Sequence, residues 1–161
     1  MAHSDDIPHT QALRWLEAHK VPYTPHLYTF EEHGGTRLAA TSLGLDEHLC
    51  IKTIVLETDT RKPLICLMHG DREISLKNLA RTLEVKTITP CTTDTAQRHT
   101  GYFCGGTSPF GTRKNLPVFV QKTILDHPTI YINGGRRGLL VAIPSQALTD
   151  TLKATPVDAM Q

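Results

Sequence analysis

The sequence has no long apolar run, no excess of charge of one sign and no cysteine framework. No stretch of its 161 residues approaches the roughly 18 consecutive apolar residues of a membrane-spanning helix. The formal net charge of +1 excludes a protein that coats nucleic acid through general basicity, although a local basic cluster is compatible with a specific RNA substrate. The four cysteines show no C-x-x-C spacing, so we expect free thiols in a reducing cytosol.

The patterns of a metal site and of a signal peptide are also missing. The nine histidines form no H-E-x-x-H or H-x-H motif, and none pairs with a cysteine at zinc-finger spacing, so we expect no metal and no other cofactor. Residues 1–6 are not a basic segment followed by an apolar run, which argues against a signal peptide. The expected protein is therefore cytoplasmic and has no membrane partner.

The composition is that of an ordinary globular domain. Hydrophobic residues make up 39% of the chain and charged residues 20%. The chain is long enough to bury a substantial core, and it contains no repeat, linker or low-complexity segment. We therefore predict a single domain over residues 1–161.

Hydrophobic periodicity and turn residues predict an α/β (α+β) fold. Helices are expected at residues 10–19, 36–43, 75–83, 95–99 and 145–153, and strands at 23–30, 51–57, 64–68, 86–89, 117–121, 129–133 and 139–143. The expected helix N-caps are Thr10, Thr36, Ser75 and Ser145. Because strands 51–57 and 64–68 read as a hairpin, we predict a mixed, mostly antiparallel sheet with flanking helices rather than a doubly wound parallel sheet.

The most informative segment is residues 101–111, Gly-Tyr-Phe-Cys-Gly-Gly-Thr-Ser-Pro-Phe-Gly, which we call the glycine loop. It holds four glycines and a proline without helical or strand periodicity. Such density indicates unusual backbone conformations or close approach to a ligand, and successive N–H groups in such a loop can bind a phosphate or an oxyanion. A long surface turn explains the same composition, and the loop lacks the Lys-Ser/Thr ending of a P-loop.

The glycine loop carries two nucleophilic side chains, Ser108 and Cys104. Ser108 does not lie in a G-x-S-x-G elbow, and no motif selects a base for it, so a turn or capping role of its hydroxyl is favoured. Cys104 is a candidate nucleophile, but a lone thiol without a catalytic role is more common.

Lys52 stands inside a strongly apolar strand, Ile-Lys-Thr-Ile-Val-Leu at residues 51–56. Both faces of this strand carry apolar residues, so either face is a candidate for burial. A lysine on a buried face must pair, bind a ligand or have a lowered pKa. The alternative is a strand-end lysine whose ammonium extends to solvent.

A second glycine block, Asn-Gly-Gly-Arg-Arg-Gly at residues 133–138, follows a predicted strand and reads as a hairpin tip. Its two arginines, Arg136 and Arg137, are candidates for bidentate contacts to phosphate. A second local basic cluster is Arg113-Lys114. A solvated turn explains the block equally well.

Three motifs, taken in order, resemble the YbaK/EbsC family of aminoacyl-tRNA deacylases, which is similar to the editing domain inserted in bacterial prolyl-tRNA synthetase. They are Ile-Lys-Thr at 51–53, Gln-Arg-x-Thr-Gly-Tyr-x-x-Gly-Gly-x-Ser-Pro-Phe-Gly at 97–111 and Ile-Tyr-Ile-Asn-Gly-Gly-Arg-Arg-Gly-Leu at 130–139. The similarity in element order covers residues 12–152. It implies hydrolysis of a mischarged tRNA, most typically Cys-tRNA(Pro), by a freestanding protein that works with prolyl-tRNA synthetase.

The resemblance also implies roles for individual residues. Lys52 matches the lysine that the family needs for activity, which holds the phosphate or ribose end of the tRNA acceptor. The residues that match the aminoacyl pocket are Gly105, Gly106, Ser108 and Pro109 in the glycine loop, together with Tyr28, Thr53 and Asn133. Two positions depart from some relatives: Asn133 replaces a serine, and Leu140 replaces an acidic residue, whose role is left unfilled.

The implied reaction needs little catalytic machinery because an aminoacyl ester is already activated. Positioning and backbone N–H donors for the oxyanion are sufficient, and a cysteinyl ester brings its own thiol, which can attack the carbonyl and release a thiolactone. The alternatives are a deacylase for another species such as Ala-tRNA(Pro), a non-catalytic RNA- or synthetase-binding module, and an enzyme that depends on Cys104.

Overall fold

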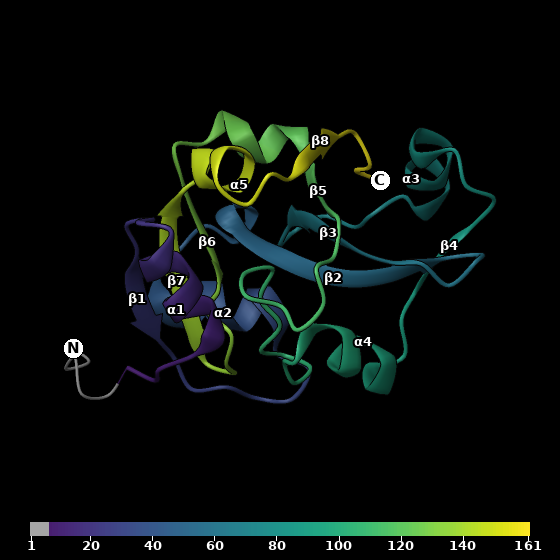
Figure 1. Cartoon of the computed structure of the whole chain (residues 1–161). Helices are drawn as coiled ribbons and strands as arrows, with labels where there is room; N and C mark the ends of the chain where they lie inside the picture. The colour runs from purple at the N-terminus through teal and green to yellow at the C-terminus, as the bar shows by residue number, and fades with distance from the viewer. Residues whose placement is uncertain (1–6) are drawn as a thin grey trace.

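An eight-stranded mixed sheet organises residues 7–161, the part of the chain that the computed structural model describes (Figure 1). The strand order is β1-β7-β6-β2-β3-β5-β8, and β4 pairs with β2 outside this path. The strands are β1 (Thr24–Leu27), β2 (Cys50–Thr58), β3 (Pro63–His69), β4 (Ile88–Pro90), β5 (Val118–Gln121), β6 (Thr129–Asn133), β7 (Leu139–Pro144) and β8 (Thr155–Val157). The predicted mixed, mostly antiparallel sheet is confirmed.

The helices flank this sheet, as predicted. They are α1 (Gln11–Ala18), α2 (Gly35–Leu43), α3 (Leu76–Leu83), α4 (Thr93–Thr100) and α5 (Gln146–Asp150), with 3-10 helices η2 (Glu47–Leu49) and η3 (Lys122–Asp126). None of the helices in residues 7–161 combines the length and the apolar character that a membrane span needs. Residues 1–6, where the sequence shows no signal-peptide pattern, lie outside the described part.

The β2–β3 hairpin is the centre of the sheet, and its predicted pairing is confirmed with Lys52 opposite Met68. On its other side β2 has two different neighbours. It pairs in parallel with β6 through Cys50 and Ile51, and antiparallel with β4 from Leu56 onward. Between these two contacts, β2 has a partner strand only on the β3 side.

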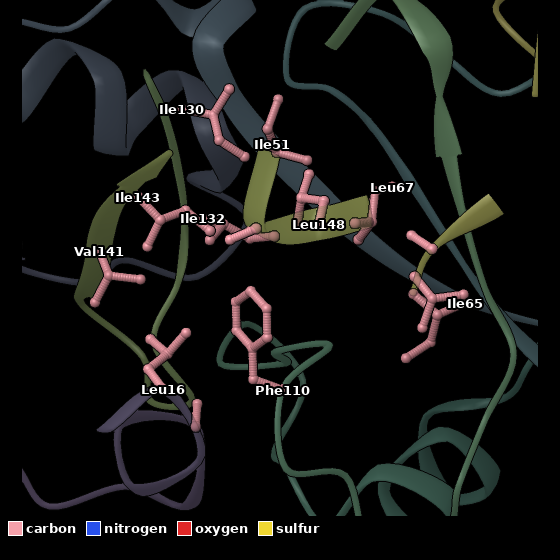
Figure 2. Packing of buried hydrophobic residues seen from close by; sticks show 14 of the residues in the cluster. Leu16, Ile51, Ile65, Leu67, Phe110, Ile130, Ile132, Val141, Ile143 and Leu148 are labelled. Atoms are coloured by element: carbon pink, nitrogen blue, oxygen red, sulfur yellow. The ribbon is translucent and has the colours of Figure 1, made fainter. Parts of the chain in front are cut away.

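The largest core lies between the sheet and α1, α5 and the glycine loop. Phe110, near the end of the glycine loop, is fully buried there beside Leu16, Ile132 and Leu148 (Figure 2). Burying a phenylalanine side chain is worth about 1.5–3 kcal/mol, so this residue anchors the loop to the core. A second cluster packs α3 against β2, β3 and β4, and a third packs α2 against Cys50 and Leu140.

Of the four predicted helix N-caps, Thr10 and Ser75 are confirmed, Ser145 is at the N-cap position but without the side-chain bond, and Thr36 is wrong. The hydroxyls of Thr10 and Ser75 accept hydrogen bonds from the N–H groups of Leu13 and Asn78. Thr36 lies inside α2, and its hydroxyl instead donates to a Glu47 carboxylate oxygen at 2.9 Å and to the Gly70 carbonyl at 3.1 Å. Ser145 makes no side-chain cap bond.

The predicted closing helix, residues 145–153, is too long. It ends at Asp150, and the chain then forms β8, which was not predicted and which pairs in parallel with β5. The chain turns because the N–H groups of Leu152 and Ala154 bond to carbonyls of the short helix rather than extending it.

Candidate active site

A cavity of about 510 Å³ opens beside the unpaired stretch of β2. Its wall is built from the segment after β1, from α2, β2 and the start of α4, and from the glycine loop and the β6–β7 turn. Most of this wall is apolar, and a minority of polar side chains line it, among them Lys52, Thr53, Thr36, Gln97, Asn133 and Arg137. This combination is typical of a small-molecule or substrate site.

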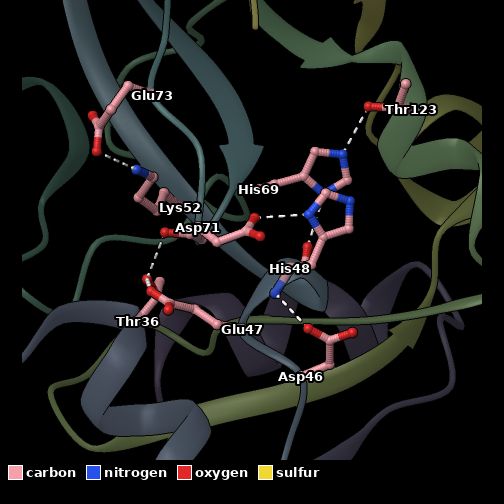
Figure 3. A network of polar contacts seen from close by, with 10 residues as sticks. Thr36, Asp46, Glu47, His48, Lys52, His69, Asp71, Glu73 and Thr123 are labelled. Carbon is pink, nitrogen blue, oxygen red and sulfur yellow. Dashed lines mark hydrogen bonds and ion pairs between the residues drawn. The ribbon is translucent and has the colours of Figure 1, made fainter. Parts of the chain in front are cut away.

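Lys52 lines the cavity from β2 and is largely buried, with 19% of its side chain exposed. Its ammonium lies 3.2 Å from a carboxylate oxygen of Glu73, whose side chain is 81% exposed (Figure 3). Of the alternatives that the sequence left open for a lysine in an apolar strand, the structure shows pairing with a carboxylate. Because Glu73 is solvated, the ion pair is weak, and the ammonium can exchange this carboxylate for an anionic ligand.

Thr53, which also lines the cavity, carries two kinds of hydrogen-bonding group that have no partner within the described residues. Its hydroxyl is buried and has no hydrogen-bond partner within the described residues. The Val55 carbonyl accepts from the Cys91 N–H and so faces away from β3; Thr53, two residues earlier, directs its own N–H and C=O the same way. No strand pairs with β2 on that side between Ile51 and Leu56 in residues 7–161, so these groups are free for a ligand.

The glycine loop reaches the cavity by packing closely against two other segments. Gly105 has a φ of 89°, and a Cβ there would lie 2.9 Å from the ring of Phe30. A Cβ on Gly106 would lie 2.7 Å from the backbone nitrogen of Arg137. Only glycine permits both contacts, so the expectation of close backbone approach explains these two positions.

Asn133 fastens the two glycine-rich segments together. Its side-chain amide donates to the Gly105 carbonyl at 3.1 Å. Its side-chain oxygen accepts from the N–H groups of Gly135 at 2.7 Å and Arg136 at 3.1 Å. Asn133 lines the cavity, as the resemblance implied, but its polar atoms hold the loops and are not free for substrate.

Arg137 completes this junction. Its Nε donates to the Cys104 carbonyl at 2.7 Å, and its guanidinium carbon lies 4.9 Å from the centre of the Phe30 ring. Its Nη1 lies 3.9 Å from a carboxylate oxygen of Glu32. The side chain lines the cavity while holding the glycine loop. Of Arg136 and Arg137, the two candidates for phosphate binding, Arg137 therefore already uses its guanidinium in contacts within the protein.

The structure brings five of the eight predicted site residues to the cavity wall. They are Tyr28, Lys52, Thr53, Gly105 and Asn133. Gly106, Ser108 and Pro109, the other three, are buried within the glycine loop and do not line the cavity. The Ser108 hydroxyl accepts from the Phe110 N–H at 3.1 Å, which is the turn role that the sequence favoured, and it faces no substrate space.

Three thiols lie in the cavity wall, those of Cys50, Cys91 and Cys104. Burial, with a smaller contribution from neighbouring carboxylates, raises the pKa of Cys50 and of Cys91 to about 11. Both are therefore protonated at neutral pH and are poor nucleophiles. Cys104 is exposed, and its backbone N–H donates to the Gln97 side chain at 3.2 Å.

The sequence patterns assign no site role to Gln97, although this residue begins the second motif. From α4, its side chain orders the glycine loop at Cys104 and lines the cavity. Its position in that motif, four residues before Gly101, is the signal that was available. Thr93 and His33 also line the cavity, but no pattern in the sequence marks them.

Comparison with known proteins agrees with this architecture. EbsC of Enterococcus faecalis (strain ATCC 700802 / V583), whose name describes a candidate Cys-tRNA(Pro)/Cys-tRNA(Cys) deacylase, is 29% identical over 140 residues, 86% of this chain and 85% of its own. The crystal structure of hypothetical protein APE2540 superposes with a TM-score of 0.85 at 19% identity, covering 94% of this chain and 99% of that one.

A second solved structure, a candidate trans-editing enzyme for prolyl-tRNA synthetase, gives a TM-score of 0.82 at 19% identity, over 96% of this chain and 99% of its own. At such identities the structural likeness establishes the fold. The family is established by the sequence itself, because residues 31–151, which include β2, the glycine loop and the β6–β7 turn, match the aminoacyl-tRNA editing domain. The chain therefore belongs to the aminoacyl-tRNA editing domain family.

Proposed function

We propose that this aminoacyl-tRNA deacylase removes cysteine from Cys-tRNA(Pro), with the aminoacyl group in the 510 Å³ cavity and the tRNA 3′ end at its mouth. The observation that carries the proposal is the Lys52 ammonium, which is largely buried and is paired with the exposed carboxylate of Glu73. The name of the Enterococcus relative supports cysteine as the amino acid. The terminal ribose or phosphate of the tRNA replaces the Glu73 carboxylate as the partner of the Lys52 ammonium.

The groups of Thr53 fit the reacting ester. The backbone N–H of Thr53 faces the side of β2 that no strand covers, and its buried hydroxyl has no partner in the described residues. A preorganised donor aimed at a developing oxyanion is worth roughly 10²–10³ in rate. Thr53 therefore supplies positioning and electrostatic stabilisation, which is sufficient for an ester that is already activated.

The thiol of the substrate supplies the nucleophile. Its sulfur bonds to the ester carbonyl carbon, the bond from that carbon to the terminal ribose oxygen breaks, and the thiol proton passes to that oxygen. The products are a four-membered thiolactone and tRNA with a free hydroxyl. This route uses none of the three thiols in the cavity wall, in keeping with the protonated state of Cys50 and Cys91.

The test is single-turnover deacylation of Cys-tRNA(Pro) and Ala-tRNA(Pro) by wild type, Lys52→Ala and Lys52→Arg. We expect loss of the cysteinyl ester to be fast in wild type, at least 100-fold slower in Lys52→Ala and partly restored in Lys52→Arg. Glu73→Gln, which frees the ammonium, is expected to lower KM. Circular dichroism verifies that each variant is folded.

Other outcomes select among the alternatives. Equal rates on the alanyl and cysteinyl esters rule out attack by the substrate thiol, and preference for the alanyl ester changes the amino acid but keeps the deacylase. Loss of activity in Cys104→Ser, which the proposal expects to be active, would instead indicate a cysteine enzyme. No hydrolysis of either ester by folded protein with synthetase present would indicate a binding module.

A further inference from the structure

Phe103, at the tip of the glycine loop, is the large hydrophobic side chain that residues 7–161 leave exposed, at 75%. It lies in a shallow second groove with Asp94, Gln97, Arg98, Gly101, Tyr102 and Arg113. No contact inside the described part of the fold explains a phenylalanine at this position. An exposed aromatic side chain next to a groove is typical of a binding surface.

The backbone on both sides of Phe103 is held in place. The Tyr102 N–H donates to the Thr100 hydroxyl at 3.2 Å, and the Cys104 N–H donates to the Gln97 side chain at 3.2 Å. The Phe103 carbonyl accepts from the Gly106 N–H at 2.8 Å. The ring is therefore presented from an ordered turn, which reduces the entropy change when a ligand stacks on it.

The groove around Phe103 is basic. Arg98 and Arg113 outnumber its one carboxylate, that of Asp94, and neither arginine forms an ion pair within the described residues. The N–H groups of Arg113 and Lys114 donate to the carbonyls of Thr100 and His99, so this basic pair is fixed against the end of α4. The local charge favours an anionic partner although the whole chain carries only +1.

The groove and the cavity share a wall. Gln97 lines both, and Cys104, which lines the cavity, directly follows Phe103. A chain that leaves the cavity across Gln97 therefore enters the groove that holds the Phe103 ring and the two arginines. An aromatic platform beside basic side chains is the way proteins bind unpaired nucleotides, with stacking worth about 1–3 kcal/mol per base.

We propose that Phe103, Arg98 and Arg113 form a subsite for the unpaired nucleotides that precede the terminal nucleoside of the tRNA 3′ end. A base stacks on the Phe103 ring, and the adjoining phosphates contact the two arginines. The proposal rests on the proposed function, because it takes the terminal aminoacylated nucleoside to occupy the cavity. It gives a role to an exposed phenylalanine in the groove beside the cavity.

The test compares two substrates, Cys-tRNA(Pro) and 2′(3′)-O-cysteinyl adenosine, which lacks the preceding nucleotides. We expect Phe103→Ala to lower the ratio of kcat/KM for the tRNA over the adenosine ester at least fivefold, mainly through KM. Phe103→Tyr keeps the stacking face and should keep the ratio. Arg81→Gln, which removes a cation from α3, is the control for net charge and should also keep it.

Binding of a labelled 5′-ACCA-3′ RNA provides a readout that needs no catalysis. Phe103→Ala should weaken binding at least fivefold. Arg98→Gln and Arg113→Gln should each reduce the slope of log Kd against log salt by about 0.7 for every phosphate that the arginine neutralises in wild type. An unchanged substrate ratio together with unchanged RNA binding overturns the subsite.

The two proposals fail in different ways. If wild type hydrolyses neither ester but binds the RNA through Phe103, the proposed function is wrong and the RNA-binding surface stands. If Phe103→Ala changes only the response to added prolyl-tRNA synthetase, Phe103 is a protein-docking residue and the RNA subsite is wrong.

Discussion

Thr53 is the residue at which stability and function are most clearly opposed. Its hydroxyl is buried without a hydrogen-bond partner in the described residues, and its backbone N–H and C=O face the side of β2 that has no neighbouring strand. A buried polar group left without a partner costs about 1–3 kcal/mol. The folded protein tolerates this cost beside the cavity, where a bound ester can satisfy the groups.

Thr53→Val tests this opposition because valine keeps the branched shape and removes the hydroxyl. We expect the free energy of unfolding in urea to be unchanged or to rise by up to about 1 kcal/mol, while kcat for Cys-tRNA(Pro) falls at least tenfold. Thr58→Val is the matched control, because the Thr58 hydroxyl is bonded to Thr60 and accepts from the Lys62 N–H, so its removal should destabilise the protein. A Thr53→Val protein with full activity would show that the hydroxyl does not contact the ester.

For single residues, the sequence predicts which kind of partner a side chain requires but not which neighbouring residue supplies it. A lysine inside an apolar strand needs a partner, and Glu73 is that partner, yet no spacing rule indicates it. The turn role of Ser108 follows from the Ser-Pro pair and is observed. The free groups of Thr53 were not predictable, because they depend on where β6 and β4 stop pairing with β2.

Among the elements, the junction of η2, the end of β3 and η3 carries a histidine cluster away from the cavity. The rings of His48 and His69 stack at 3.7 Å, and the ring of His127 lies 5.6 Å from His48 and 6.0 Å from His69. Nδ1 of His69 donates to the His48 carbonyl, and Nε2 lies 2.7 Å from the Thr123 hydroxyl, which donates to it when the ring is neutral (Figure 3). These bonds fit a neutral His69.

Acid should therefore destabilise the fold through His69. Burial lowers the pKa of His69 below its ordinary value of 6.5 and outweighs the hydrogen bond to the His48 carbonyl, which raises it; of the nearby charged groups, His48 and His127 lower this pKa and Asp71 raises it. The unfolded chain then binds the proton more tightly, so the contribution of His69 to stability is complete above pH 6.5 and declines below it, by at most about 1.4 kcal/mol per pH unit.

Urea unfolding at pH 7.5, 6.5 and 5.5 measures this decline. We expect His69→Gln to be less stable at pH 7.5 but to lose less stability between pH 6.5 and 5.5, because glutamine has no proton to bind. His9→Gln, which changes an exposed histidine, should keep the wild-type slope. Equal slopes in all three proteins would show that another group dominates the acid response.

The elements that the sequence predicted well are those with sustained apolar patterns. The β2–β3 hairpin, β6, β7 and the helices capped by Thr10 and Ser75 fall in this class. The sequence did not predict β8 or the early end of α5, which are segments of three and five residues. Pairing with β5 sets the structure of β8, and backbone hydrogen bonds in the turn after Asp150 end α5. Such short segments are decided by tertiary contacts rather than by local propensity.

For the molecule as a whole, the site is assembled from segments that lie far apart in the sequence. The glycine loop was recognised as informative from its composition alone, but its contacts with Phe30, Asn133 and Arg137 appear only in the folded chain. Phe110 holds the end of the loop in the main core, and Asn133 holds the middle of the loop at Gly105. The cavity is therefore a product of the complete fold rather than of one motif.

The charge of the molecule sets a limit on how it selects tRNA. A net charge of +1, with local basic clusters beside the site, gives little long-range attraction to the body of a tRNA, so the protein alone should read mainly the 3′ end. We expect similar kcat/KM values for Cys-tRNA(Pro) and Cys-tRNA(Cys) with the isolated protein, and at least a fivefold preference for Cys-tRNA(Pro) when prolyl-tRNA synthetase is added. The measurement is deacylation of both species with and without an excess of synthetase, with cysteinyl-tRNA synthetase as the control. A strong preference by the isolated protein would show that it reads the tRNA body directly, through a surface other than the basic groove beside Phe103.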